Sequence, residues 1–492
     1  MSFERADNPD FIAQLRAELG DEGVITTGED LQYYGSDRCR GGWPVAPGAI
    51  ARPTSIEQVE AIARLCSEHE IAIVPSGGRT GLTGAATATA GELVVSLERM
   101  AKVLEVDVPG RLLRCQAGAT VEAIQLAADE VGLAYPVDFA AKGSAQIGGS
   151  IATNAGGVKV IRHGLTRERV AGLEVVLADG RRLSLGGKLV KNNTGYDLRQ
   201  LFIGSEGTLG LIVEATLSLT QPPAGHVVAL CSLRDDAAVL ELFTRLRQQR
   251  SLTLSAFECF DRGCIEAVVA HRGVDQAGPL AELGPMQVLV EVEVAASELA
   301  ADDDADEGAA EADPTASPSF DGLVELLADA QDEGLILDAT LAQTEAQARE
   351  LWAWREDISE SLHPHTPHKA DVAVPVTRVV EFVGRWREAV STALPEIPAR
   401  CFGHVGDGNL HLNLLRPEGM ALEPFLDRCH EFDPVLYDLV EAFEGSVSAE
   451  HGIGLLKRDY LDRTRSEAEI AAMRSIKAIF DPKGILNPGK VF

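Results

Sequence analysis

The stretch PSGGRTGLTG, residues 75–84, directly follows the apolar run IAIV of residues 71–74. Its glycines, at positions 77, 78, 81 and 84, let backbone N–H groups turn toward an anion without a side chain blocking close approach. The stretch has neither the GK[ST] ending of a P-loop nor the GxGxxG pattern of the common dinucleotide-binding turn. On its own it indicates an anion-binding loop no more strongly than a tight turn between two strands.

Two further loops favour the anion-binding interpretation. AKGSAQIGGSIATNAGG, residues 141–157, and FIGSEGTLGLI, residues 202–212, are also rich in Gly, Ser and Thr, and each adjoins an apolar run. Three such loops suit a long ligand that carries a pyrophosphate, such as a dinucleotide cofactor.

The sequence around these loops, from residue 49 to about residue 223, alternates β-rich runs with helical patterns, as in α+β or α/β proteins. Ser55 or Thr54 is expected to cap a helix that continues through residue 67. The Asp-Gly pair at 179–180 predicts the turn of a hairpin.

PSGGRTGLTG, PVDFAAKGSAQIGGSIATNAGG and IGSEGTLGLIVEATLSL together resemble the FAD-binding domain of the vanillyl-alcohol oxidase type, also called PCMH-type. The resemblance covers about residues 49–223 and implies two α+β subdomains that hold FAD. Some members attach the flavin covalently through a His in the first loop, whereas this loop has Arg79 and no His or Cys, so we expect non-covalent FAD. By resemblance, the FAD-binding residues are Pro75, Gly77, Gly78, Thr80, Gly81, Leu82, Gly84, Pro136, Asp138, Ser144, Gly148, Gly149, Ala152, Asn154, Gly157 and Ile212.

A histidine-rich pair of motifs lies farther along, in CFGHVGDGNLHLNL (401–414) and GSVSAEHGIG (445–454). His411 and Asn413 are two apart in a strand pattern, which places both on one face. His404 lies across a Gly-Asp-Gly turn, near enough to converge with His411. Two His and a carboxylate are common ligands of Zn²⁺ or a similar divalent ion, and Glu450 is the third candidate ligand.

GHVGDGNLHLNL and SAEHGIGLLKRDYL are similar to the C-terminal domain of FAD-linked oxidases, as found in D-2-hydroxyacid dehydrogenases. The resemblance implies that His404, His411 and Glu450 bind the metal, that Asn413 contacts substrate and that His451 is the base. It also implies an α+β substrate (cap) domain with an antiparallel sheet. The final ILNPGKVF resembles the family's tail, which returns to the flavin, and Asn487 is the residue expected there.

Substrate specificity is suggested by LWAWREDISESLHPHTPHKADVAVPV, residues 351–376. Arg355 and Ser359 are four apart on a helix predicted around residues 345–361, and Lys369 begins the next strand. In D-2-hydroxyglutarate dehydrogenases the similar stretch supplies an Arg, a Thr and a Lys to the substrate carboxylate, and here Ser359 replaces the Thr. Two cations suit a substrate with two carboxylates, which favours D-2-hydroxyglutarate.

Other functions stay open at this point. D-lactate or glycolate would need fewer cations, so a D-lactate or glycolate dehydrogenase is the alternative within the class. From other classes, the chain is alternatively a non-catalytic flavin-binding subunit or a metal-dependent hydrolase. The resemblance suggests electron-transfer flavoprotein or a quinone as the electron acceptor, and it is compatible with a homodimer.

Composition narrows the class of protein. The chain has 492 residues, 45% of them hydrophobic, and a formal net charge of −31, which argues against disorder, nucleic-acid binding and adhesion to an anionic membrane. No run of about 18 apolar residues predicts a membrane span, and the first residues lack a signal-peptide pattern. The eight cysteines form no CxxC pair, so neither an iron–sulfur nor a Cys-rich zinc site is expected, and we predict a cytoplasmic protein.

The predicted organisation has four parts: an N-terminal segment (1–48), the PCMH-type domain (49–223), the cap domain (224–444) and a C-terminal segment (445–492) that contributes to the active site. The cap domain contains an acidic Ala/Asp/Pro stretch at 295–319, which is expected to be an insertion loop, or alternatively a docking segment for a basic partner.

Overall fold

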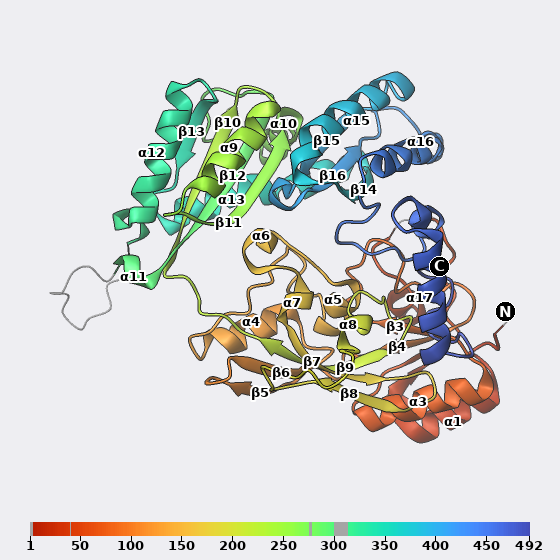
Figure 1. The fold of residues 1–492 in the computed structure, drawn as a ribbon. Helices are drawn as coiled ribbons and strands as arrows, with labels where there is room; N and C mark the ends of the chain where they lie inside the picture. The colour runs from red at the N-terminus through yellow and green to blue at the C-terminus, as the bar shows by residue number, and fades with distance from the viewer. Residues whose placement is uncertain (1–2, 40, 275–277, 300–312) are drawn as a thin grey trace. The chain divides into compact units, whose positions relative to one another are not determined.

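The computed structural model describes residues 3–39, 41–274, 278–299 and 313–492. The chain forms two compact units, each with its own sheets (Figure 1). The first unit comprises Met1–Gly157, Gly164–Pro222 and Glu450–Phe492, and the second comprises Val158–His163 and Pro223–Ala449.

The first unit contains two sheets. The smaller sheet has the strand order β1-β2-β4-β3, in which β2, β4 and β3 are parallel, and the larger is antiparallel with the order β5-β6-β9-β7-β8. The elements are α1 (Pro9–Leu19), β1 (Val24–Ile25), α2 (Asp30–Tyr34), β2 (Ala49–Ala51), α3 (Ile56–His69), β3 (Ile73–Ser76), β4 (Leu93–Ser96), β5 (Val103–Asp107), β6 (Leu112–Gln116), α4 (Val121–Asp129), α5 (Ile147–Thr153), α7 (Thr166–Arg169), β7 (Val170–Val176), β8 (Arg182–Gly186), α8 (Arg199–Phe202), β9 (Leu211–Ser218) and α17 (Glu467–Phe480).

Local sequence signals explain several of these elements. The hydroxyl of Ser55 accepts the N–H of Gln58 and caps α3, and the apolar residues of α3, from Val59 to Cys66, are buried on one face. Strands β7 and β8 pair antiparallel around the Asp179-Gly180 turn, where Gly180 adopts a φ of +79°. The predicted helix and hairpin are therefore confirmed.

The second unit is built on one antiparallel sheet with the order β13-β10-β12-β11-β15-β16-β14, which confirms the predicted antiparallel sheet. Its elements are α6 (Val160–His163), β10 (Gly225–Leu233), α9 (Ala237–Gln248), β11 (Thr253–Asp261), α10 (Arg262–Arg272), β12 (Met286–Val294), α11 (Ala296–Leu299), α12 (Pro318–Asp332), β13 (Ile336–Leu341), α13 (Glu345–Glu356), α14 (Ile358–Leu362), β14 (His368–Ala373), α15 (Val379–Ala393), β15 (Ala399–Gly403), β16 (Asn409–Leu414) and α16 (Leu422–Ala442).

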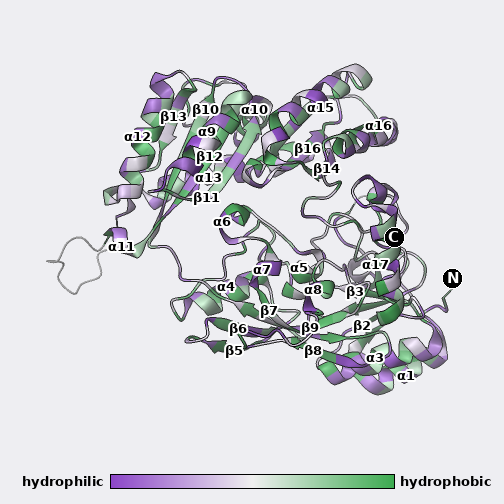
Figure 2. Ribbon diagram, in the orientation of Figure 1, coloured by the Kyte–Doolittle hydropathy of each residue, from purple (hydrophilic) through white to green (hydrophobic). Residues whose placement is uncertain are grey.

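Helices cover both faces of the central strands in this unit. On one face, residues of β10–β12 such as Phe260 and Leu289 form a core with α10, α13 and α14. On the other face, Phe243 of α9 packs against Phe257 of β11, with ring centroids 4.9 Å apart. Figure 2 shows mainly hydrophobic central strands and helices of mixed hydropathy. Because β11 is covered on both sides, any charged residue on it needs a partner inside the protein.

Two details differ from the sequence-based expectation. The helix expected around residues 345–361 is interrupted at Asp357, a weak helix former whose carboxylate is bound by Arg272. The stretch 295–319 begins with α11 and ends in α12, whose first turn is capped by Ser317. Most of it, residues 300–312, lies outside the described residues.

No helix in the described ranges combines the length and apolarity required to cross a bilayer.

Candidate active site

The three glycine-rich loops meet in the first unit. A Cβ on Gly78 would overlap the carbonyl oxygen of Ser144, and a Cβ on Gly207 would lie 2.6 Å from the Pro75 ring. The N–H of Glu206 donates to the carbonyl oxygen of Ala152 over 2.8 Å. The loops therefore converge as the sequence suggested, and glycine is needed at positions 78 and 207 because backbone and ring approach so closely.

The first loop offers unused hydrogen-bond donors. Within the described part of the chain, none of the backbone N–H groups of residues 77–82 has an acceptor, and these residues are partly exposed. A Cβ on Gly149, in the first turn of α5, would meet nothing within 4 Å. Consecutive donors beside open space fit the pyrophosphate of a dinucleotide such as FAD.

The remaining residues of the FAD prediction also lie in this unit. Gly157 has a φ of +136°, and a Cβ there would overlap the carbonyl of Asp138. The side-chain oxygen of Asn154 accepts the N–H of Arg167 over 2.9 Å, and Asn154 has a φ of +52°. Several others are buried in the loops or the adjoining core: Gly84, Pro136, Gly148 and Ile212. These contacts fix the loops' shape, and direct contact with FAD stays a prediction for each residue.

Asn487 connects two of these loops. Its side-chain nitrogen donates to the carbonyls of Ala85 (2.9 Å) and Glu206 (2.7 Å), and its backbone N–H donates to Ile73 (2.7 Å). The C-terminal tail thus returns to the glycine-rich loops of its own unit.

His451 is held in the first unit through its backbone. Its carbonyl accepts the Thr83 hydroxyl over 3.2 Å, and Glu206 accepts the N–H groups of Ile453 (2.7 Å) and Gly454 (2.8 Å) just beyond it. Glu206 is 6% exposed, and burial raises its pKa from 4.5 to about 7. The carboxyl of Glu206 therefore anchors the turn that carries His451.

A buried carboxylate lies between two predicted site residues of the second unit. Glu258, on β11, is fully buried, and one oxygen lies 2.6 Å from Nδ1 of His404. Its other oxygen accepts Nε (2.9 Å) and Nη2 (2.8 Å) of Arg355. Burial alone would raise the pKa of Glu258, but the facing His404 and Arg355 lower it overall.

The structure brings His404 and His411 together, with their Nε2 atoms 3.4 Å apart. Two nitrogen ligands bound at 2.0–2.1 Å to a tetrahedral ion are about 3.4 Å apart. Nδ1 of His411 lies 3.6 Å from Asp371, its direct partner across β14 and β16. Each ring thus has a carboxylate at Nδ1 while its Nε2 points toward the other, an arrangement that fits a divalent metal.

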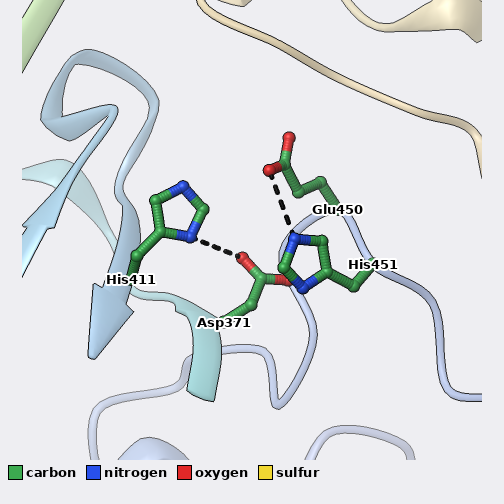
Figure 3. A group of neighbouring side chains, drawn as sticks. All are labelled: Asp371, His411, Glu450 and His451. Atoms are coloured by element: carbon green, nitrogen blue, oxygen red, sulfur yellow. Dashed lines mark ion pairs between the residues drawn. The ribbon is translucent and has the colours of Figure 1, made fainter. Parts of the chain in front are cut away.

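Glu450 and His451 directly follow Ala449, whose N–H donates to Asp371 over 3.1 Å. Figure 3 draws these two residues, which belong to the first unit, and Asp371 and His411, which belong to the second. The ligand set of His404, His411 and Glu450 stays a prediction.

The four predicted substrate residues have different environments. Lys369 and Asn413 are direct partners across β14 and β16, and Asn413 is 2% exposed. Ser359 is exposed on α14. Arg355 is 7% exposed, bound to Glu258 and stacked 4.8 Å from the Phe402 ring centroid. Their roles in substrate binding stay predictions, and the charge of Arg355 is already compensated within the protein.

No sequence motif predicted Glu258, Asp371 or Glu206 as site residues. The available signal was a carboxylate within an apolar strand, FECF for Glu258 and ADVAV for Asp371. Glu206 lies within FIGSEGTLGLI, a motif that indicates anion binding through its Gly, Ser and Thr residues and not through its carboxylate.

Comparisons with known proteins agree with these features. A family model described as FAD linked oxidases, C-terminal domain, matches residues 222–491, and an FAD binding domain model matches residues 47–186. The chain is 46% identical to a D-2-hydroxyglutarate dehydrogenase of Xanthomonas citri pv. viticola, covering 94% of this chain and 93% of that protein. It is 42% identical to one of Stutzerimonas stutzeri, covering 99% of each.

Solved structures share this fold. A p-cresol methylhydroxylase with substrate bound has a TM-score of 0.75 at 17% identity, covering 99% of this chain and 97% of that one. An alkyldihydroxyacetonephosphate synthase has a TM-score of 0.71 at 17% identity, covering 99% and 86%. The PCMH-type α+β fold is thereby confirmed, and the chain belongs to the family of FAD-linked oxidases.

Proposed function

We propose that this protein is an FAD-dependent dehydrogenase that oxidises D-2-hydroxyglutarate to 2-oxoglutarate with the help of a divalent metal. The observation that carries the proposal is the His404–His411 pair, spaced like two metal ligands in a chain whose near-full-length relatives are named D-2-hydroxyglutarate dehydrogenase. A metal-binding histidine pair suits a substrate whose hydroxyl and carboxylate can chelate the ion.

FAD would be held without a covalent bond, because the first loop offers N–H donors and Arg79 but no His or Cys. The N–H groups of residues 77–82 would bind the pyrophosphate. When bound, FAD supplies the acceptor for the hydride that leaves carbon 2 of the substrate.

The metal ligands would be Nε2 of His404, Nε2 of His411 and the carboxylate of Glu450. Asp371 would act on Nδ1 of His411, since it lies 3.6 Å from that nitrogen. When bound, Zn²⁺ or a similar ion lowers the pKa of the substrate hydroxyl.

His451 would accept the hydroxyl proton. Its ring is partly exposed, and its backbone is fixed by Thr83 and by the turn that Glu206 holds. Loss of the O–H proton to His451 and of the C–H hydrogen as hydride leaves the carbon–oxygen double bond of the 2-oxo acid.

Lys369, Arg355, Ser359 and Asn413 would contact the substrate. A lysine beyond the metal suits a second carboxylate, which favours D-2-hydroxyglutarate over D-lactate or glycolate. We further propose electron-transfer flavoprotein or a quinone as the electron acceptor and a cytoplasmic location.

The test is an anaerobic substrate panel. Purified protein should show flavin absorption bands near about 375 and 450 nm, and D-2-hydroxyglutarate should bleach the 450 nm band faster than D-lactate, glycolate or L-2-hydroxyglutarate. Prior treatment with a chelator should slow bleaching, and Zn²⁺ should restore it.

Each part of the proposal has its own contradicting result. Absence of flavin bands would exclude the flavoenzyme, and bleaching by no hydroxy acid would favour a non-catalytic flavin-binding subunit. Faster bleaching by D-lactate would favour a D-lactate dehydrogenase instead. Bleaching that is insensitive to the chelator would show that the reaction does not need a metal.

A further inference from the structure

We propose that Glu258 is the positioning residue of the metal site: it fixes the tautomer and orientation of His404, and Arg355 keeps its carboxylate stable inside the protein. The inference rests on the proposed function, because it assigns a role to Glu258 only if His404 binds a metal.

The geometry links three side chains from three different elements. Glu258 lies on β11, Arg355 on α13, and His404 directly after β15. One oxygen of Glu258 is 2.6 Å from Nδ1 of His404, and the other accepts two N–H groups of Arg355 at 2.8 and 2.9 Å. The two oxygens therefore serve different partners.

Because Glu258 is buried, its ionised carboxylate needs both of these partners. The side chain has no solvent exposure, and an unpaired carboxylate inside a protein costs several kcal/mol. Arg355, with 8% side-chain exposure, supplies the compensating charge. Without Arg355, His404 would be the one described residue left within hydrogen-bond distance of the Glu258 carboxylate.

The hydrogen bond selects the tautomer of His404. An ionised carboxylate only accepts hydrogen bonds, so Nδ1 of His404 must carry a hydrogen, and in the neutral imidazole Nε2 then keeps its lone pair. That lone pair belongs to the atom 3.4 Å from Nε2 of His411. Glu258 thus sets the tautomer and ring orientation that His404 needs as a metal ligand already in the metal-free protein.

The Phe402 ring lies between the Glu258–Arg355 ion pair and His411. Its ring lies 4.8 Å from the Arg355 guanidinium and has its centroid 5.2 Å from that of His411. Arg355 therefore contacts Glu258, the partner of His404, and Phe402, the ring neighbour of His411.

The experiment measures zinc affinity of the FAD-loaded full chain by competition with a chromophoric chelator. Glu258→Gln should weaken Zn²⁺ binding about 10- to 100-fold, as expected for loss of a carboxylate partner of a ligand histidine. The flavin spectrum checks that the variant is loaded with FAD, and tryptophan fluorescence, which mainly follows the second unit, checks that this unit is folded.

Glu291→Gln is the matched control. Glu291 is a buried, ion-paired acid on the neighbouring strand β12, with Lys159 at 3.1 Å and the Trp352 indole at 2.9 Å. This variant should lose thermal stability but keep wild-type zinc affinity. An equal loss of affinity in both variants would show a general packing effect and overturn the proposal.

A double variant covers a folding failure of Glu258→Gln. Glu258→Gln/Arg355→Met removes both buried charges together, which leaves no uncompensated charge. It too should bind zinc about 10- to 100-fold more weakly.

Wild-type affinity in either Glu258 variant would overturn the positioning role alone. If the wild-type chain itself binds no zinc, the metal part of the proposed function fails instead, and the inference fails with it. The wild-type titration therefore distinguishes the two failures.

Discussion

At the residue scale, Glu206 couples protonation to the turn that carries His451. Its pKa is raised by burial from 4.5 to about 7, although two backbone N–H groups lower it. Between these pH values the folded chain keeps a proton on Glu206 that the unfolded chain has released. Raising the pH through this range therefore lowers the free energy of unfolding, by up to about 3 kcal/mol.

Glu206→Gln should reduce this pH dependence. The amide replaces one acceptor oxygen by an NH₂ group, so one of the two backbone bonds is lost and stability falls by about 1–3 kcal/mol near pH 5. Near pH 8 the difference should be smaller, because the wild type then carries a buried charge. Thermal unfolding of the wild type and the variant at pH 5 to 8 measures this difference in stability. A difference that grows with pH would contradict the raised pKa of Glu206.

Lys369 and Arg355 should respond differently to substitution. Lys369→Met should lower kcat/KM for D-2-hydroxyglutarate about 10- to 100-fold through loss of a charged hydrogen bond and leave D-lactate nearly unaffected. Arg355→Met should lower kcat/KM for both substrates, because it leaves Glu258 buried without its cation. Steady-state kinetics with both substrates measures the ratios, and an equal loss in Lys369→Met would remove its role in specificity.

At the element scale, the sequence predicted what is determined by neighbouring residues. The α3 cap, the β7–β8 hairpin and the strand around His411 follow from capping, turn chemistry and periodicity within a few positions. The Glu258 contacts do not, since Arg355 and His404 are 97 and 146 positions away. Such partners are fixed by strand order, here by β11 lying beside β15, and no local pattern records that order.

Helix α6 depends on a similar long-range contact. Glu293 of β12 binds Nε of Arg162 (2.7 Å) and Nε2 of His163 (2.8 Å), and these partners lower its pKa to about 2 against the effect of burial. Glu293→Gln should weaken this attachment by about 1–3 kcal/mol. Hydrogen exchange in peptides covering residues 158–165 should then become at least about tenfold faster.

The control for α6 is Glu241→Gln, which removes a surface ion pair with Arg245 on α9. Surface pairs contribute little, so exchange in α9 should stay nearly unchanged. Unchanged exchange in 158–165 of the Glu293 variant would mean that packing alone holds α6.

At the scale of the whole molecule, the two spatial units are not continuous stretches of the chain. The first unit takes three separate chain segments, and the last, Glu450–Phe492, joins it through the bridge of Leu486 to Ile73 and the bonds of Asn487. Each unit has its own sheets, so each can unfold in a transition of its own. Only the first unit contains the glycine-rich loops.

Removal of FAD should therefore destabilise the first unit selectively. Free FAD at about 100 times its Kd would stabilise the unit that binds it by about 2.7 kcal/mol. Trp352, Trp354 and Trp386 lie in the second unit and only Trp43 in the first, so tryptophan fluorescence mainly follows the second unit. Calorimetry should show one unfolding transition whose midpoint temperature is lower without FAD. The midpoint temperature measured by tryptophan fluorescence should not change.

Asn487→Ala should reproduce part of this effect with FAD present. The substitution removes two hydrogen bonds that join the glycine-rich loops, so FAD affinity should fall about 10- to 100-fold, and the first unit's transition should move toward that of the FAD-free protein. Asn409, on β16 of the second unit, offers the matched replacement Asn409→Ala, which should leave FAD affinity unchanged. If FAD removal lowered the fluorescence midpoint as much as the calorimetric one, the two units would unfold together, and the cofactor would stabilise the whole chain rather than the unit whose loops bind it.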